Sequence, residues 1–310
     1  MWHRTARPVY RDGPEASVRG VMMKEMAGGP APERSIGAAA LSFVRGETAK
    51  TAALKAAVLA TEDPEAVHDL RVTIRRIRTA IRVLGSFLRP EVTALDEPLH
   101  GLFLELGHVR DLDIALDAWG DDESAAHLEV LERIVAIQAT ARLHLTVCLV
   151  KDSPLDALKL TLRKSPPSAG SAPCLEAAPV VLREAYDATR SAAKRLSKAS
   201  PAEDIHRLRR RIKRLRYAVE FFAADYGKPA EKLAKQLRKL QDLLGLNQDA
   251  LLVARVLREL PDLGPDARAL AEAAAVRFEA RAVKLRGKIL DAAEDFGGDT
   301  WDRLKRRMKQ

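Results

Sequence analysis

The sequence has few aromatic residues, two cysteines and no long apolar run. Aromatic residues make up 5% of the 310 residues, while alanine, leucine and arginine are abundant, and this composition favours helices. Cys148 and Cys174 match no metal-binding or redox spacing, so we expect two reduced thiols. No apolar stretch approaches the roughly 20 residues that span a bilayer, and the N-terminal residues lack the apolar region of a secretory signal. The sequence therefore predicts a soluble cytoplasmic protein.

Positive charge is what the sequence has in excess. The net charge is +9 and the pI is about 9.6. A strongly basic protein suggests an anionic partner, although the charge says nothing about the fold. Apolar residues make up 47% of the chain, as in ordinary globular proteins, which argues against wholesale disorder.

Apolar residues recur at helical spacing along most of the chain. Asp63 and Pro64 are typical of a helix start, and Ser200 to Glu203 form a capping-box pattern with Pro201 in the first helical position. No segment has a convincing strand pattern, so we expect an all-α protein of antiparallel helices. The expected helices cover residues 36–60, 64–88, 91–119 with a break near Gly107, 123–150, 180–198, 202–224, 228–245, 249–260, 266–294 and about 300–309.

The pattern also suggests how the chain is divided. Residues 1–35 contain glycine and proline without sustained periodicity, and we expect a mobile basic tail there. Residues 36–310 are expected to form one domain. Within it the proline-rich segment 164–179 is the expected linker between a first helical half, 36–163, and a second, 180–310.

One basic motif occurs twice. "HDLRVTIRRIRT" at residues 68–79 and "HRLRRRIKRLRY" at 206–217 are related by a constant offset of 138 residues. The same offset continues without a gap through apolar positions and relates Gly107 to Gly245 and Asp111 to Asp249. This conservation of charge, apolar face, glycine and aspartate indicates an internal duplication, and a pseudo-twofold relation would bring the two basic helices together.

The repeated frame H-x-x-R-x-x-x-R/K-R-x-R resembles the CHAD family, as do "DPEAVHDLRV" (63–72), "VRDLDIAL" (109–116) and "LQDLLGLNQDALL" (240–252). The resemblance covers about residues 36–295. It implies two similar four-helix bundle halves related by internal duplication, which bind inorganic polyphosphate through a basic channel and are not known chiefly as enzymes. In many members a CYTH-type triphosphatase domain precedes this domain. No such pattern is found here, so we expect a stand-alone binding domain.

The basic residues of each motif copy form a row along one side of the expected helix, and these two basic rows suit a polyphosphate chain. Guanidinium groups make bidentate, charge-assisted hydrogen bonds to phosphate oxygens. A polyphosphate has no bases, whereas a groove for single-stranded nucleic acid would add aromatic stacking platforms, and the basic stretches contain only Tyr217. The residues predicted to bind polyphosphate are His68, Arg71, Arg75, Arg76, Arg78, Arg82, His206, Arg209, Arg210, Lys213, Arg214 and Arg216.

Several alternatives stay open at this point. The rows could be a solvated face neutralised by acidic residues from elsewhere, and the protein could be a nucleic-acid-binding or scaffolding protein. A metal-dependent phosphoanhydride hydrolase would need clustered carboxylates, which do not accompany the rows. We expect no catalytic residue and no cofactor. The expected partners are inorganic polyphosphate and other proteins of cytoplasmic polyphosphate granules, with nucleic acid disfavoured and no membrane.

Individual residues also have two interpretations. His68 and His206 either contact phosphate or orient their helices, and we expect no metal site because no carboxylate or cysteine stands at ligand spacing beside them. Asp111 and Asp249 are expected to cap a helix or to pair with an arginine of the basic helices; the alternative is that they serve as a base or hold a metal ion.

Overall fold

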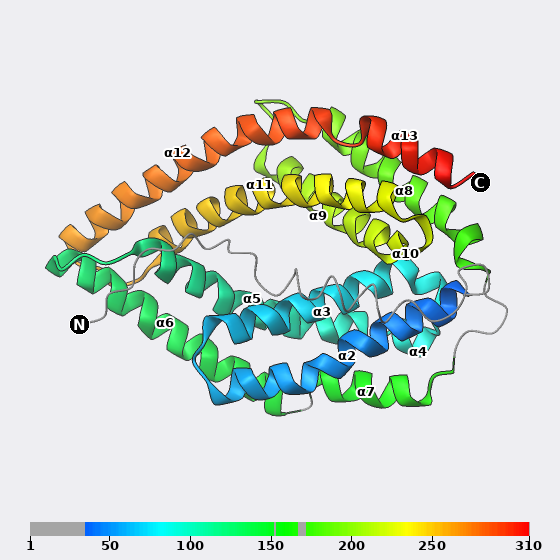
Figure 1. The fold of residues 1–310 in the computed structure, drawn as a ribbon. Coiled ribbons are helices and arrows are strands. Elements are labelled where there is room, and N and C mark those ends of the chain that lie inside the picture. The colour runs from blue at the N-terminus through cyan, green and yellow to red at the C-terminus, as the bar shows by residue number, and fades with distance from the viewer. Residues whose placement is uncertain (1–34, 152, 167–171, 310) are drawn as a thin grey trace.

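We analysed a computed structural model, which describes residues 35–151, 153–166 and 172–309 (Figure 1). The predicted basic tail lies almost entirely outside these residues. Within them the chain forms helices and no strands, and one antiparallel bridge joins Ser35 to Pro173, so the all-α prediction is confirmed. The longer helices are α2 (Ile36–Ala60), α3 (Pro64–Leu84), α5 (Asp96–Trp119), α6 (Ala125–Val150), α7 (Pro154–Lys164), α8 (Cys174–Lys194), α9 (Ala202–Phe221), α11 (Lys228–Glu259), α12 (Pro265–Asp295) and α13 (Gly298–Arg307). Three short helices complete the order, namely the 3₁₀ helix η2 (Gly85–Phe87) and the α-helices α4 (Pro90–Thr93) and α10 (Ala223–Tyr226).

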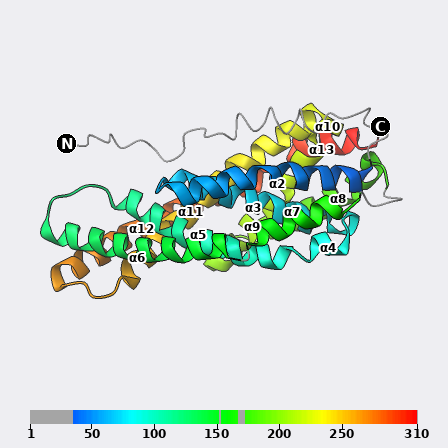
Figure 2. The ribbon, with the colours of Figure 1, turned by 90° about the horizontal axis from the view of Figure 1, so that it is seen from below.

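The helices form two series in the same order. The first consists of α2, α3, α5, α6 and α7, and the second of α8, α9, α11, α12 and α13. Helix α2 begins at Ile36 and α8 at Cys174, while α3 begins at Pro64 and α9 at Ala202, so the sequence offset of 138 residues also relates the helix starts. Figure 1 shows the second series lying over the first, and Figure 2 shows both running along one long axis. The halves meet where α5 contacts α11, α3 contacts α9 and α6 contacts α12.

Local sequence explains why the two basic helices form and how they pack. Asp63 caps α3 by accepting a hydrogen bond from the Glu65 backbone N–H at 3.0 Å, and Pro64 follows as predicted. Each helix then buries one apolar stripe, which leaves its basic residues along the edge of the packing. The stripes are Leu70, Ile74, Ile77 and Ile81 in α3, and Leu208, Ile212, Leu215 and Val219 in α9.

Three predicted breaks between helices are wrong. At each place the local sequence suggests an end to the helix, but tertiary packing favours its continuation. Helix α5 continues through Gly107, and α11 continues through residues 246–248. Helix α8 begins at Cys174 and includes Pro179, so the connection between the halves is shorter than the predicted linker 164–179. Burial of Leu182 and of other α8 residues offsets the single backbone hydrogen bond that Pro179 cannot donate.

Two further local predictions need correction. Helix α7 was not expected, although Pro154 at its first turn suits a helix start. The capping box at Ser200 to Glu203 does not form, because the Ser200 Oγ accepts a hydrogen bond from the Ser197 backbone N–H at 2.9 Å, and α9 begins at Ala202 without a side-chain cap.

Helix α6 has an apolar outer surface. Within the described residues, one segment, Ala125–Lys164, meets the length and mean hydropathy of a membrane span, with only 22% of its most apolar window buried. Leu143, Val147 and Val150 are 71%, 58% and 66% exposed. The expectation that no apolar stretch reaches this length therefore needs correction, because a few interspersed polar residues hide a high mean hydropathy. Helices of soluble proteins meet the same criteria, so this feature does not assign the protein to a membrane.

Replacing Gly297 and Gly287 by alanine should change the stability of the protein in opposite directions. Gly297 has a φ of 90°, and a Cβ there would lie 2.8 Å from the Tyr186 ring, which stacks on Trp301 at 3.9 Å. Gly287 lies inside α12 with open space around it. We expect Gly297→Ala to lower the free energy of unfolding by about 1–3 kcal/mol, and Gly287→Ala to raise it by up to about 1 kcal/mol. Urea denaturation measures both, and equal effects would contradict this packing of α13 on α8.

Candidate functional site

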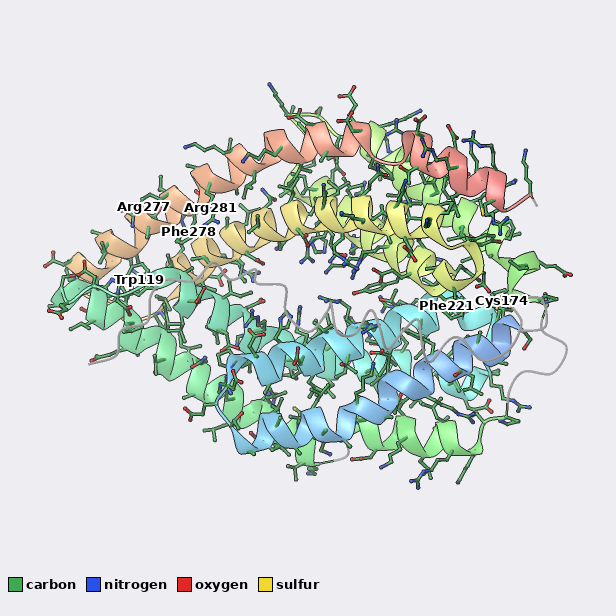
Figure 3. The ribbon with its side chains drawn as sticks, in the orientation of Figure 1. Trp119, Cys174, Phe221, Arg277, Phe278 and Arg281 are labelled. Carbon is green, nitrogen blue, oxygen red and sulfur yellow. The ribbon has the colours of Figure 1, made fainter. Side chains whose placement is uncertain are left out.

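Four positive side chains meet where α3 contacts α9. Arg71 and Arg75 belong to α3, and Arg209 and Lys213 belong to α9. Burial, followed by the charges of Arg75 and Arg209, lowers the pKa of Arg71 to about 10, although Asp111 acts in the opposite direction. We call these four residues the central cluster. Figure 3 shows nitrogen-tipped side chains gathered between the two halves in this region.

Lys213 of the central cluster is surrounded by positive charges. Burial and the charges of Arg75, Arg209, Arg71 and Arg216 hold its pKa well below the ordinary value. Among the described residues, no carboxylate forms an ion pair with Lys213. The side chain is only partly buried, so solvent or a ligand can reach part of it.

Arg75 is held by a tyrosine of the opposite half. Its Nε donates a hydrogen bond to the Tyr217 Oη at 3.2 Å. Burial raises the pKa of Tyr217, but the charges of Arg75 and Arg216 outweigh it and bring the pKa below its ordinary value. Tyr217 therefore belongs to the site, although the sequence had suggested only that it ends the basic stretch.

Helix α5 positions Arg71. The guanidinium lies over the Phe103 ring, with the Cζ 4.4 Å from the ring centroid, which is a cation–π arrangement. A Cβ on Gly107 would lie 3.4 Å from the Arg71 Nε. Gly107 therefore gives Arg71 space to lie across α5, and this close approach explains the glycine better than the helix break that we had expected.

The repeated aspartates lie near the same junction. Asp111 and Asp249 are in the interiors of α5 and α11, so the expectation that they cap helices is wrong. The Asp111 Oδ2 is 3.8 Å from the Arg255 Nη2. Burial raises the pKa of Asp111, Arg71 and Arg255 oppose this effect, and Asp249 adds to it. Arg209 lowers the pKa of Arg71, and Asp249 raises that of Asp111, so two pairs of positions related by the sequence offset interact electrostatically.

Six of the predicted binding arginines stand beside carboxylates instead. Most of these acids belong to other helices or lie before the basic stretch, so the motif itself does not show them. Arg78 and Arg216 are only 7% and 4% exposed in their side chains, which indicates structural roles. The pairs are Arg76–Glu47 (3.5 Å), Arg78–Asp96 (3.0 Å), Arg82–Asp96 (2.8 Å), Arg210–Glu203 (3.1 Å), Arg214–Glu184 (4.0 Å) and Arg216–Glu220 (3.1 Å).

The two motif histidines have different surroundings. The His206 Nδ1 is 3.4 Å from the Gln248 Oε1 of α11. His68 stands with Glu65 and Asp69, whose ligating atoms all lie within 4.8 Å of one another. The expectation that no carboxylate is near His68 is therefore wrong, because residues three positions apart are neighbours on a helix. Burial, followed by the charges of Glu65 and Asp63, raises the pKa of Asp69.

The larger of the two most prominent cavities lies away from the central cluster. It has a volume of about 520 Å³ and lies at the end of the molecule where α5, α6 and α12 meet (Figure 3). Its lining includes Trp119, Arg277, Phe278 and Arg281. The predicted basic channel at the central cluster stays a prediction.

The fold and its central cluster define a class of protein, a duplicated all-helical domain with cations gathered where its halves meet. The family model of the CHAD domain matches residues 43–258, and the chain belongs to the CHAD family. This family is linked to polyphosphate-related proteins and generally serves for binding.

The chain is also similar to solved structures and to curated sequences. The CHAD domain from the plant Ricinus communis has a TM-score of 0.71 and 23% identity, over 86% of this chain and 94% of that chain. PptA from Streptomyces chartreusis has a TM-score of 0.63 and 15% identity, over 84% and 99% of the two chains. These likenesses show the fold. The uncharacterized Mycobacterium tuberculosis proteins MT2285 and Rv2226 are each 29% identical over 210 residues, which cover 61% of this chain but only 39% of each relative.

Replacing Lys213 by methionine should stabilise the ligand-free protein. The pKa of Lys213 is lowered in the folded state, so below that pKa both folded and unfolded chains carry its proton and the cost is constant. Between the folded and ordinary pKa only the unfolded chain keeps the proton, so the free energy of unfolding rises with pH. We expect Lys213→Met to raise stability at pH 7 by about 1 kcal/mol and to remove this rise.

Urea denaturation of the parent protein and of Lys213→Met between pH 7 and pH 10 measures the free energy of unfolding of each. The difference between the two curves reports Lys213 alone, because all other titrating groups are shared. The exposed Lys284 of α12 provides the control, since Lys284→Met should change little. A Lys213→Met variant that is less stable than the parent at pH 7 would show that the lysine has a favourable partner.

Proposed function

We propose that this protein binds inorganic polyphosphate without cleaving it, at the central cluster between its two halves. The observation that carries the proposal is the convergence of four cations from α3 and α9, among them a lysine that forms no ion pair with a carboxylate of the described residues. Like charges held this close raise the free energy of the empty site, and a polyanion would relieve that repulsion.

The types of side chain support phosphate as the bound group. Arg71, Arg75 and Arg209 can each offer two parallel N–H donors to phosphate oxygens, and Lys213 adds a compact charge. A linear polyphosphate carries about one charge per unit, so a short row of cations matches it. Outer arginines such as Arg82 and Arg210 are already paired with carboxylates, and we assign them no direct role.

The aromatic residues of the site disfavour nucleic acid as the ligand. The face of Phe103 is covered by the Arg71 guanidinium, and the Tyr217 ring lies 4.5 Å from the Arg216 Cζ. Rings that are already covered by arginines are not free to stack on bases, which is the usual source of affinity for single strands.

The two repeated aspartates at the junction favour binding without hydrolysis. Cleavage of phosphoanhydrides generally uses divalent metal ions held by clustered carboxylates. Asp111 and Asp249 lie at the junction, but Arg71 and Arg255 act on Asp111, and burial raises its pKa. A carboxylate in such surroundings is a poor ligand for a hard cation. Binding to long chains would also retain the protein at cytoplasmic polyphosphate granules, and this retention would depend on the same four cations.

Removing the central cluster should abolish polyphosphate binding. We expect the fourfold variant Arg71→Ala, Arg75→Ala, Arg209→Ala, Lys213→Ala to lose at least about 100-fold in affinity, because each replaced residue supplied a charged hydrogen bond. Isothermal titration with long-chain polyphosphate at about 0.15 M salt measures this, and circular dichroism checks the fold. The matched control replaces four exposed, carboxylate-paired arginines by alanine and should lose only about threefold; these residues are Arg82, Arg207, Arg210 and Arg214.

Equal losses in the two fourfold variants would mean that overall charge, and not the central cluster, holds the chain. A parent protein that does not bind polyphosphate near physiological salt would refute the proposed function altogether.

Polyphosphate should also outcompete RNA. At equal phosphate concentration we expect single-stranded RNA to displace little polyphosphate, because the site offers cations but no free ring for the bases. Fluorescence anisotropy of a labelled polyphosphate, with unlabelled RNA as competitor, measures the displacement. Efficient displacement by RNA would favour the nucleic-acid-binding alternative.

A further inference from the structure

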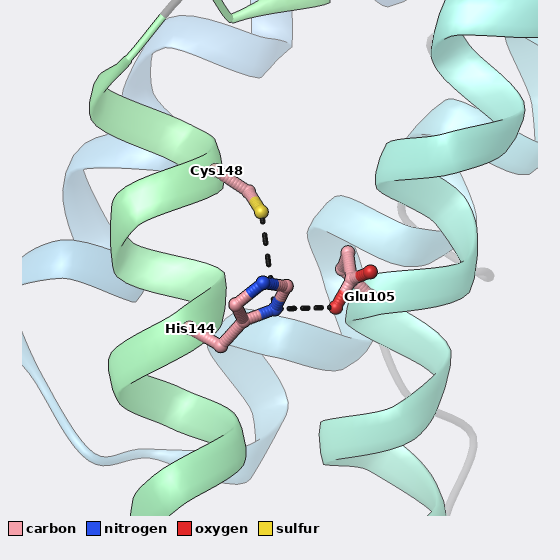
Figure 4. Close-up of side chains that lie close together, drawn as sticks. All are labelled: Glu105, His144 and Cys148. Atoms are coloured by element: carbon pink, nitrogen blue, oxygen red, sulfur yellow. Dashed lines mark hydrogen bonds and ion pairs between the residues drawn. The ribbon is translucent and has the colours of Figure 1, made fainter.

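Three side chains with metal-binding atoms meet on the outer side of α5 and α6. His144 and Cys148 are one turn apart on α6, and Glu105 faces them from α5 (Figure 4). The His144 Nδ1 is 2.9 Å from the Glu105 Oε2 and 4.0 Å from the Cys148 Sγ. One ligating atom from each residue lies within 4.8 Å of the other two. None of the three belongs to the basic helices α3 and α9.

These separations suit a tetrahedral metal ion. Zinc binds cysteine sulfur at about 2.3 Å, histidine nitrogen at about 2.0–2.1 Å and carboxylate oxygen at about 2.0–2.2 Å, which places the ligand atoms roughly 3.5 Å apart. The His144–Cys148 separation of 4.0 Å exceeds this value slightly, and the His144–Glu105 separation of 2.9 Å falls slightly short of it. Small side-chain rotations therefore suffice, and the helical i, i+4 spacing keeps His144 and Cys148 on one face.

The charges around the group favour a cation over a reactive thiolate. Burial and the negative charge of Glu105 raise the pKa of the Cys148 thiol, whereas a nucleophilic cysteine needs a lowered pKa. Arg142, two residues before His144, does not neutralise the group, because its Nη2 lies 3.6 Å from the Asp113 Oδ1. Cysteine sulfur together with imidazole selects zinc-like ions over magnesium or calcium.

We propose that Glu105, His144 and Cys148 form a binding site for a zinc ion, with water at the fourth position. His144 binds through Nδ1 and carries its proton on Nε2, while the Cys148 thiol proton passes to solvent as the sulfur–metal bond forms. The ion ties α5 to α6 by bonds that the apolar packing of these helices does not provide. This site is independent of the proposed polyphosphate site and does not rest on it.

Cobalt substitution in the full-length, metal-free protein tests the proposal. We expect one equivalent of Co²⁺ to give the absorption of tetrahedral cobalt and a thiolate-to-cobalt charge-transfer band, and Zn²⁺ to displace it. Competition with a chromophoric chelator then gives the zinc affinity. Cys148→Ser should abolish the charge-transfer band and weaken zinc binding at least about 100-fold, and Glu105→Gln should weaken it about tenfold.

Two controls match these variants. Cys174→Ser removes the other cysteine, which is buried in α8, and should leave the cobalt spectrum unchanged. His100→Ala removes a histidine of α5 that stands 3.9 Å from Glu97 without a cysteine, and it should not change zinc affinity. Circular dichroism confirms that each variant remains helical.

A parent protein without the thiolate band, or zinc affinity unchanged by Cys148→Ser, would overturn the proposal. Zinc binding that survives Cys148→Ser but is lost in His68→Ala would place the metal at Glu65, His68 and Asp69 instead. Polyphosphate titration of Cys148→Ser keeps the two sites distinguishable, because we expect its affinity to equal that of the parent.

Discussion

Repulsion among cations at the junction of the two halves is the constraint around which this molecule is organised. Arg71, Arg75, Arg209 and Lys213 come from two helices that the fold brings into contact. The positive charges of Arg75 and Arg209 help to lower the pKa values of Arg71 and Lys213. The helices cannot separate to relieve this repulsion without exposing apolar surface, because the apolar stripes of α3 and α9 belong to one hydrophobic core that includes residues of both halves. The free energy of apolar burial is thus used in part to hold charges together.

The remaining basic residues show how the fold limits that cost. Arg78 and Arg216, which the offset relates, are both buried and both paired, yet their partners differ. Arg78 forms an ion pair with Asp96 of α5, whereas Arg216 forms one with Glu220, which lies one turn further along α9 itself. The duplicated halves therefore neutralise these two related arginines with unrelated carboxylates.

The sequence contained enough information for the architecture and for the contact between the two basic helices. A constant offset, two basic helices and their apolar stripes predicted a duplicated helical fold, and helix starts in the structure follow that offset. The offset could not show which arginines form ion pairs with carboxylates, because Glu47, Asp96 and Glu184 belong to other helices. Local signals also failed where packing is strong: Gly107 continues a helix and makes room for Arg71. The ligand group on α5 and α6 was missed because its members lie 39 and 43 residues apart in the sequence and meet only in the fold.

Positions related by the sequence offset, such as Arg71 and Arg209, act on one another across the junction. This arrangement has a consequence for any elongated ligand that binds there. A linear chain of identical phosphate units reads the same from either end, unlike a peptide or a nucleic acid strand. A site built from two related halves can therefore accept such a chain in both orientations, so each encounter offers two productive alignments instead of one. Two positions break this equivalence: Lys213 stands at the position related to Arg75, and Tyr217 at the position related to Thr79. These differences would give a bound chain a preferred direction.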